Sequence, residues 1–192
     1  MSRAFLSPSR CADGTTTSPL RRALDTVSDT DGRKERASDD ESVTQRLVRD
    51  LSLQQGIVEI RGNVDAIVPG ASEELVRLSP RRAFLFSDGD PAEVARRVRE
   101  SGVLAYDATG ALAGIAIASE QVMRRLTDLD LARIPTAGSF AHVTALFRRG
   151  ADDWFHVYVQ QELGHYVAEA VLDALVGLGS DPWGLTPAGA AA

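Results

Sequence analysis

Short apolar runs, joined in neighbouring pairs by tight turns, most restrict the fold of this 192-residue chain. In the clearest pair, residues 103–106 and 111–118 flank the turn Asp107–Gly110. Runs of this length around a glycine-containing turn are typical of a β-hairpin. Because such pairs alternate with helical patterns, the sequence predicts an α+β domain, with an antiparallel or mixed sheet of about four to six strands and amphipathic helices packed on it.

Other apolar runs indicate further strands. Residues 57–60 alternate at period two and residues 64–68 are apolar again after a Gly-Asn pair, which predicts a short hairpin. Residues 83–86 are expected to form a compact strand. Residues 141–147 and 154–159 flank a polar segment, and periodicity leaves open whether they form a hairpin or a helix followed by a strand.

Helical patterns lie between the predicted strands. The helix with the clearest start follows Asp90, which can cap it, with Pro91 at the first helical position and Glu93 completing an Asp-x-x-Glu box. Apolar residues at helical spacing also predict helices over residues 41–54, 72–78, 119–134 and 167–175.

The composition changes sharply along the chain. Residues 1–42 hold seven Arg or Lys and eight Asp or Glu with only scattered apolar side chains. Such a segment cannot bury enough apolar surface to offset the entropy of ordering it, so it is expected to be a disordered tail. Residues 43–180 are expected to form a single α+β domain, followed by a flexible C-terminal tail over residues 181–192.

Charge and cysteine content exclude several classes of partner and location. The net charge of −6 offers no basic surface for nucleic acid or an anionic membrane, and no apolar run approaches the roughly 18 residues of a membrane span. Cys11 is the only cysteine, so a disulfide within the chain is excluded and a cytoplasmic location is expected. No motif identifies a cofactor or an oligomeric state.

One segment suggests metal chemistry. Gln161–His165 is similar to the zinc-binding His-Glu-x-x-His pattern, but Gln161 replaces the first histidine and an amide is a poor zinc ligand. A metal-dependent hydrolase would use Glu162 as base and His165 as ligand, with His142 or His156 as a further ligand. The alternative is an ordinary helix start.

Three fragments within residues 101–167 follow one another in a suggestive order. Ser101–Val103 opens the predicted hairpin, Gly138–His142 follows, and Val159–Gly164 ends an apolar strand. In this order they resemble the diadenylate cyclase domain family, which makes or senses cyclic di-AMP. The resemblance covers about a third of the chain.

The departures from this family affect its catalytic groups. Ser101 stands in place of the metal-binding aspartate, and Phe140-Ala141 stand in place of the arginine and histidine that handle phosphates. Without the aspartate no anchor for Mg²⁺ remains, and phosphoryl transfer depends on that ion. The resemblance therefore implies a domain that binds a nucleotide without catalysis, in a pocket bordered by Gly102, Gly138, His142 and Glu162, where the glycines let a ligand approach the backbone.

These observations predict a non-catalytic regulatory domain that binds a ligand or a partner, in the form of a degenerate nucleotide sensor. One alternative is the metal-dependent hydrolase around Glu162 and His165. The other is an assembly or interaction protein without a small-molecule ligand, in which an amphipathic helix docks a partner protein.

Overall fold

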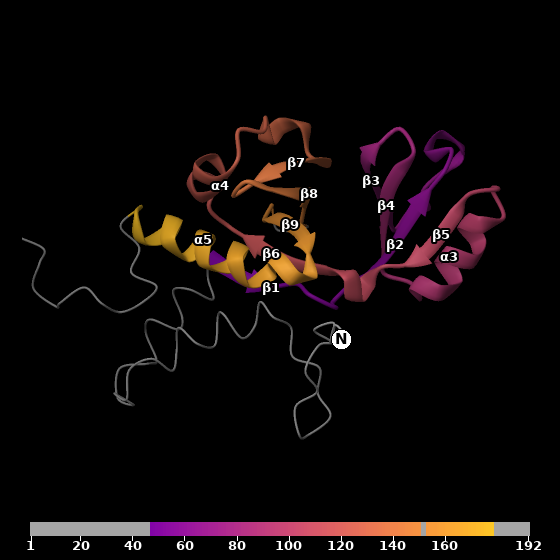
Figure 1. Cartoon of the computed structure of the whole chain (residues 1–192), viewed down its shortest axis with the longest axis horizontal. Helices are drawn as coiled ribbons and strands as arrows, with labels where there is room; N and C mark the ends of the chain where they lie inside the picture. The colour runs from indigo at the N-terminus through magenta and orange to yellow at the C-terminus, as the bar shows by residue number, and fades with distance from the viewer. Residues whose placement is uncertain (1–46, 151–152, 179–192) are drawn as a thin grey trace, which may run out of the picture.

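The structure of the chain, a computed structural model, describes residues 47–150 and 153–178. The predicted tails, residues 1–42 and 181–192, lie outside the described residues. Within the described part, nine strands form two antiparallel sheets. Figure 1 shows the α-helices packed on them. The predicted α+β class is confirmed, and its strands are divided between two sheets.

The five-stranded sheet has the order β1 (Val48–Asp50), β6 (Leu112–Ile117), β9 (Phe155–Gln160), β8 (Val143–Arg149) and β7 (Thr136–Phe140). The four-stranded sheet has the order β3 (Glu73–Ser79), β4 (Arg82–Ser87), β2 (Gly56–Arg61) and β5 (Leu104–Asp107). The described α-helices are α3 (Pro91–Arg99), α4 (Glu120–Leu126) and α5 (Gly164–Val176). Single turns of 3-10 helix are η1 (Val64–Ala66), η2 (Thr109–Ala111), η3 (Leu131–Arg133) and η4 (Gln161–Leu163).

Helices α4 and α5 cover one face of the five-stranded sheet and enclose the larger core. Val167 and Val171 of α5 are fully buried against the sheet, where Phe140 and Phe147 meet edge to face with ring centroids 5.9 Å apart. The predicted closing helix is therefore confirmed, because its apolar residues recur at the spacing that aligns them on one side.

Helix α3 covers one face of the four-stranded sheet. The Asp90 side chain accepts a hydrogen bond from the N–H of Ala92 at 3.2 Å, and Pro91 is the first helical residue. Val94 and Val98 pack against the buried side chains of β2 and β4. The predicted start of this helix is confirmed, since the cap satisfies one of its free amides.

The remaining faces of the two sheets pack against each other, with β3 lying beside β7 and β8. Phe86 and Tyr158 meet across the interface with ring centroids 4.8 Å apart. Arg148 donates hydrogen bonds to Glu74 and to Gln55, and its guanidinium lies 4.4 Å from the Phe86 ring centroid. Because only 11% of the Arg148 side chain is exposed, a largely buried ion pair joins the two sheets.

The prediction that residues 103–118 form a hairpin is wrong, because its two strands do not pair with each other. Both strands exist, but β5 pairs with β2, whereas β6 pairs with β1 and β9 in the other sheet. Every residue of Leu112–Ile117 is buried, as expected of a central strand with a partner on each side. The segment between the strands is thus the crossover from one sheet to the other.

Several other predicted elements also differ. Residues 72–78, expected to be helical, lie mostly in β3, and the described part of the helix predicted over 41–54 contains β1. Residues 64–68 contain η1 in place of a second hairpin strand, and the helix predicted over 119–134 is shortened to α4 and η3. Short apolar runs fit either period, and strand pairing in the folded protein decides between them.

Two further strand predictions are confirmed. The run at residues 83–86 lies in β4, and the hairpin alternative holds for residues 141–159, because β8 and β9 pair antiparallel. Among the helices of the described ranges, none has the length and apolarity needed to span a membrane.

Candidate functional site

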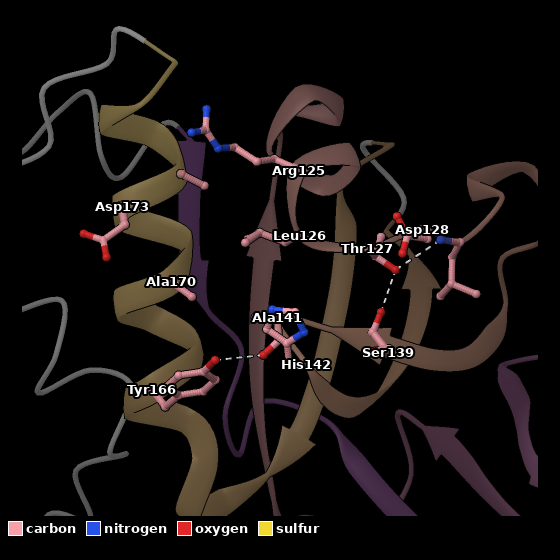
Figure 2. Close-up of a pocket in the computed structure, with 12 residues that line it drawn as sticks. Arg125, Leu126, Thr127, Asp128, Ser139, Ala141, His142, Tyr166, Ala170 and Asp173 are labelled. Atoms are coloured by element: carbon pink, nitrogen blue, oxygen red, sulfur yellow. Dashed lines mark hydrogen bonds between the residues drawn. The ribbon is translucent and has the colours of Figure 1, made fainter.

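A cleft of about 710 Å³ lies between α4, α5 and the β7–β8 turn, and we name it the helix–hairpin cleft (Figure 2). It is lined by Arg125, Leu126, Thr127, Asp128, Leu129, Ser139, Ala141, His142, Tyr166, Ala170, Asp173 and Ala174. Its volume falls in the range of about 300–1,000 Å³ that is usual for ligand pockets.

The β7–β8 turn at this cleft has a strained backbone. Ala141 and His142 have φ values of 47° and 68°, in the left-handed region that favours glycine and asparagine. The neighbours hold the turn: the Ala141 N–H donates to the Leu126 carbonyl at 2.8 Å, and the Tyr166 hydroxyl donates to the Ala141 carbonyl at 3.0 Å. Such strain persists where surrounding contacts enforce it, and it is frequent at functional sites.

Hydrogen bonds within the fold occupy several polar groups of the cleft. The Tyr166 hydroxyl is bound to the backbone as described, the Thr127 hydroxyl donates to the Ser139 carbonyl at 2.6 Å, and Arg125 donates to the Gly177 carbonyl at 3.3 Å. His142 lies at the β7–β8 turn, and the Asp173 carboxylate on α5 points away from that turn (Figure 2). The arrangement can bind a polar ligand, but among its described residues no nucleophile is hydrogen-bonded to a base, as covalent catalysis requires.

A second cavity of about 330 Å³, the inter-sheet hollow, opens where the two sheets meet. It is lined by Leu78, Arg82, Phe84, Leu112, Thr144, Leu146, Tyr158, Val159 and Gln160. A third cavity of about 250 Å³ shares Leu78 and Thr144 with it and includes Gly138 and His142. The lining of the inter-sheet hollow is mostly apolar, and Arg82 supplies a positive charge.

The structure brings together two of the four residues predicted to border a nucleotide pocket. Gly138 in β7 and His142 in the following turn line the third cavity together, and His142 also lines the helix–hairpin cleft. Gly102, with φ 78°, lies in the loop between α3 and β5 of the four-stranded sheet. Glu162 lies in η4. Neither lines any of the three cavities described above.

The residues of the proposed hydrolase do not form a metal-ligand set. His165 lies in the first turn of α5, and its Nε2 is 3.1 Å from Oε1 of Glu169. Glu162 is in the preceding turn, while His142 lies in the β7–β8 turn. Across residues 47–150 and 153–178, no three His, Cys, Asp or Glu side chains are placed to hold a metal ion.

The sequence did not reveal the polar part of the helix–hairpin cleft. The Tyr166 side chain reaches across to the β7–β8 turn, and the residue is 45% exposed. Thr127 was not singled out. No local sequence pattern marks either residue, because the hydroxyl of each donates a hydrogen bond to a backbone carbonyl that is 12 or more residues away in the sequence.

His142→Gly is expected to stabilise the protein by about 0.5–1 kcal/mol, since glycine adopts φ 68° without a Cβ penalty. The free energy of unfolding from urea titration is the measurement. His142→Ala is the matched control, because it removes the imidazole but keeps the strained backbone, and it should give no gain. Equal stability of all three proteins would show that the turn is unstrained.

Scans of the sequence against protein-family models and against curated proteins give no match. Among solved structures, the fold is similar to a chain of the heterotetrameric sarcosine oxidase from Corynebacterium sp. U-96 in complex with pyrrole 2-carboxylate. The two chains are 12% identical with a TM-score of 0.60, and the match covers 84% of this chain and 95% of that chain. At this identity the likeness shows a shared fold, and a fold alone does not define an activity.

Proposed function

We propose that this protein is a non-catalytic chain that binds a partner protein within a larger enzyme assembly. The observation that carries the proposal is the extent of the fold likeness. It spans 95% of a chain that belongs to a heterotetrameric oxidase, so the similarity involves nearly that whole chain. The proposal retains the cytoplasmic location expected from the single cysteine.

The geometry of the cavities supports the non-catalytic part. In the helix–hairpin cleft, the Thr127 and Tyr166 hydroxyls both donate to backbone carbonyls, which fixes the turn. Such bonds stabilise the fold but leave these donors unavailable to a reacting group. The described residues also lack a metal-ligand set, so a hydrolase around Glu162 and His165 gains no support from the geometry.

The test is purification of the tagged full chain from the organism that encodes it. We expect a second protein to co-purify in a fixed ratio, and the complex to have an enzymatic activity that the isolated chain lacks. Native mass spectrometry gives the ratio. A chain that remains a monomer under these conditions, or that has activity by itself, would overturn the proposal.

A ligand-binding role at the helix–hairpin cleft, including the nucleotide sensor, is the second candidate function. The observation that favours it is that Gly138 and His142 border one cavity next to this cleft, although they were selected from the sequence alone. The predicted partner would then be a nucleotide such as cyclic di-AMP.

Thermal melting with ATP, cyclic di-AMP, Zn²⁺ and Mg²⁺ tests the second candidate. A ligand at about 100 times its dissociation constant adds roughly 2.7 kcal/mol, which raises the melting temperature of a domain of this size by several degrees. A nucleotide-specific rise that His142→Ala removes would support the sensor. A rise with Zn²⁺ alone would support the hydrolase, and no rise would leave the partner-binding role.

A further inference from the structure

The four-stranded sheet has one face that is only partly covered. This face is the one opposite α3, because side chains alternate between the two faces along each strand. At its inner end, Ile57 and Phe86 are buried against the five-stranded sheet. At the outer end, Leu104 and Tyr106 of β5 are 57% and 49% exposed. We name this outer part the open sheet face.

Strand register places arginines beside these apolar side chains. Across β4, β2 and β5, Arg82 pairs with Arg61, which pairs with Leu104. In the next row on the same face, Glu59 lies between Phe84 and Tyr106. Because directly opposed side chains are close neighbours, the open sheet face presents two arginines and two large exposed apolar groups together.

The charges on this face do not balance. Arg61 and Arg82 are like charges directly opposite each other, an arrangement that is unfavourable unless compensated. Glu59 compensates one of them: its Oε1 accepts from Nε of Arg61 at 2.8 Å and from Nε of Arg82 at 2.7 Å. Both bonds use Nε, and the terminal guanidinium nitrogens make no further hydrogen bond to the described residues, while the Arg82 guanidinium lies 5.4 Å from the Phe84 ring centroid.

Glu59 is ionised over the working pH range of most proteins. Burial alone would raise its pKa, but the hydrogen bonds and charges of the two arginines outweigh burial and lower the pKa. The Glu59 side chain is 15% exposed, whereas Arg61 and Arg82 are 56% and 38% exposed. A partner therefore meets mainly the two cations and their surplus positive charge.

The inter-sheet hollow adjoins one of these arginines, Arg82. Arg82 lines the hollow and, among its described lining residues, is the one that carries a formal charge. Phe84 and Leu146 belong to the apolar part of the lining. A group that enters the hollow therefore meets apolar walls with a cation at one side.

We propose that the open sheet face and the inter-sheet hollow bind a segment of the partner protein in which a carboxylate side chain neighbours a large apolar side chain. The carboxylate would accept from the terminal guanidinium nitrogens of Arg61 and Arg82, and the apolar side chain would fill the hollow. This inference rests on the proposed function, because it requires a partner protein.

Two observations favour a protein segment over a small molecule. Leu104 and Tyr106 lie on a strand that contributes nothing to the hollow, so a ligand confined to the hollow would leave them uncovered. Tyrosine and arginine are also the residues enriched at the energetic centres of protein interfaces. Charge complementarity then selects an acidic segment, since guanidinium groups bind carboxylates through paired hydrogen bonds.

The experiment uses the complex purified from the encoding organism, dissociated and re-formed with variants of the full chain. Arg61→Glu combined with Arg82→Glu should weaken the dissociation constant by about 100-fold or more, because it replaces attraction with repulsion. Arg61→Gln combined with Arg82→Gln, which removes both cations and leaves Glu59 without an oppositely charged neighbour, should weaken it by about 10-fold. Circular dichroism melting confirms that each variant is folded.

The matched control is Arg96→Glu combined with Arg124→Glu, which changes the net charge equally on α3 and α4, away from the open sheet face. Its dissociation constant should stay within about 3-fold of the unchanged protein. Unchanged binding by both open-face variants would overturn this inference while the proposed function stands. If no partner co-purifies, or if the partner is nucleic acid or a second copy of this chain, the proposed function and this inference both fail.

Discussion

Gly114→Ala is expected to destabilise the protein by about 3 kcal/mol, although it adds a single methyl group. Gly114 lies in β6 directly opposite Tyr158, and a Cβ at this position would be 2.5 Å from Cε1 and 2.8 Å from Cδ1 of that ring. The ring cannot move aside freely, because it is 3% exposed and packs on Phe86. Overpacking of this kind typically costs about 1–3 kcal/mol, and the interface between two sheets allows little relaxation.

Gly110→Ala is the matched control for this substitution. No atom lies within 4 Å of a Cβ built at Gly110, so its free energy of unfolding should change by less than about 0.5 kcal/mol. Urea titration followed by circular dichroism measures both variants. A loss below about 1 kcal/mol for Gly114→Ala would mean that the two sheets can separate slightly, and that their interface is less tightly packed than the Tyr158 and Phe86 rings indicate.

The close approach of Gly114 and Tyr158 depends on the pairing of β6 with β9, which the sequence did not predict. The run at residues 112–117 correctly indicated a strand, but its partners depend on which other strands cover its two edges. β5, adjacent in sequence, has two large exposed side chains, Leu104 and Tyr106, and pairs at the edge of the other sheet. A tight turn between two strands is therefore a weak guide to pairing when one strand is buried on all sides and the other is not.

Local sequence patterns were sufficient to predict a helix, because the backbone hydrogen bonds of a helix form within one segment. The Asp90 cap and Pro91 defined the start of α3, and the apolar side of α5 defined that helix. Residues 72–78 carried no comparable signal. They became β3 because β4 offers a neighbouring strand edge, and this pairing outweighs the modest helix preference of the segment.

Of the candidate site residues, some could be predicted from the sequence and others depend on strand pairing. His142 was predicted as a pocket residue through the resemblance to the diadenylate cyclase family, and the structure places it at the helix–hairpin cleft. The group formed by Glu59, Arg61 and Arg82 could not be found in this way, because it depends on the register between β2 and β4. An error of one residue in that register would move Glu59 to the α3 side of the sheet.

Arg148→Met is expected to destabilise the protein by about 2–3 kcal/mol, because it removes the cation that joins the two sheets. Arg148 contacts Glu74 of the other sheet and Gln55, which directly precedes β2, and its loss would leave a partly buried carboxylate without its partner. Breaking a fully buried pair costs about 3–5 kcal/mol, and the 30% exposure of Glu74 reduces this. Burial raises the pKa of Tyr158, so its hydroxyl is neutral and Glu74 is the anionic partner.

A double-mutant cycle separates this pair from simple loss of packing. Arg148→Met combined with Glu74→Met removes both charges, so the double variant should be more stable than the sum of the two single losses indicates, by at least about 1 kcal/mol. Arg124→Met is the surface control, because its pair with Glu120 is exposed and contributes at most about 0.5 kcal/mol. Additive losses in the cycle would mean that Arg148 stabilises the interface through its contact with the Phe86 ring, and that the two sheets are joined by packing alone.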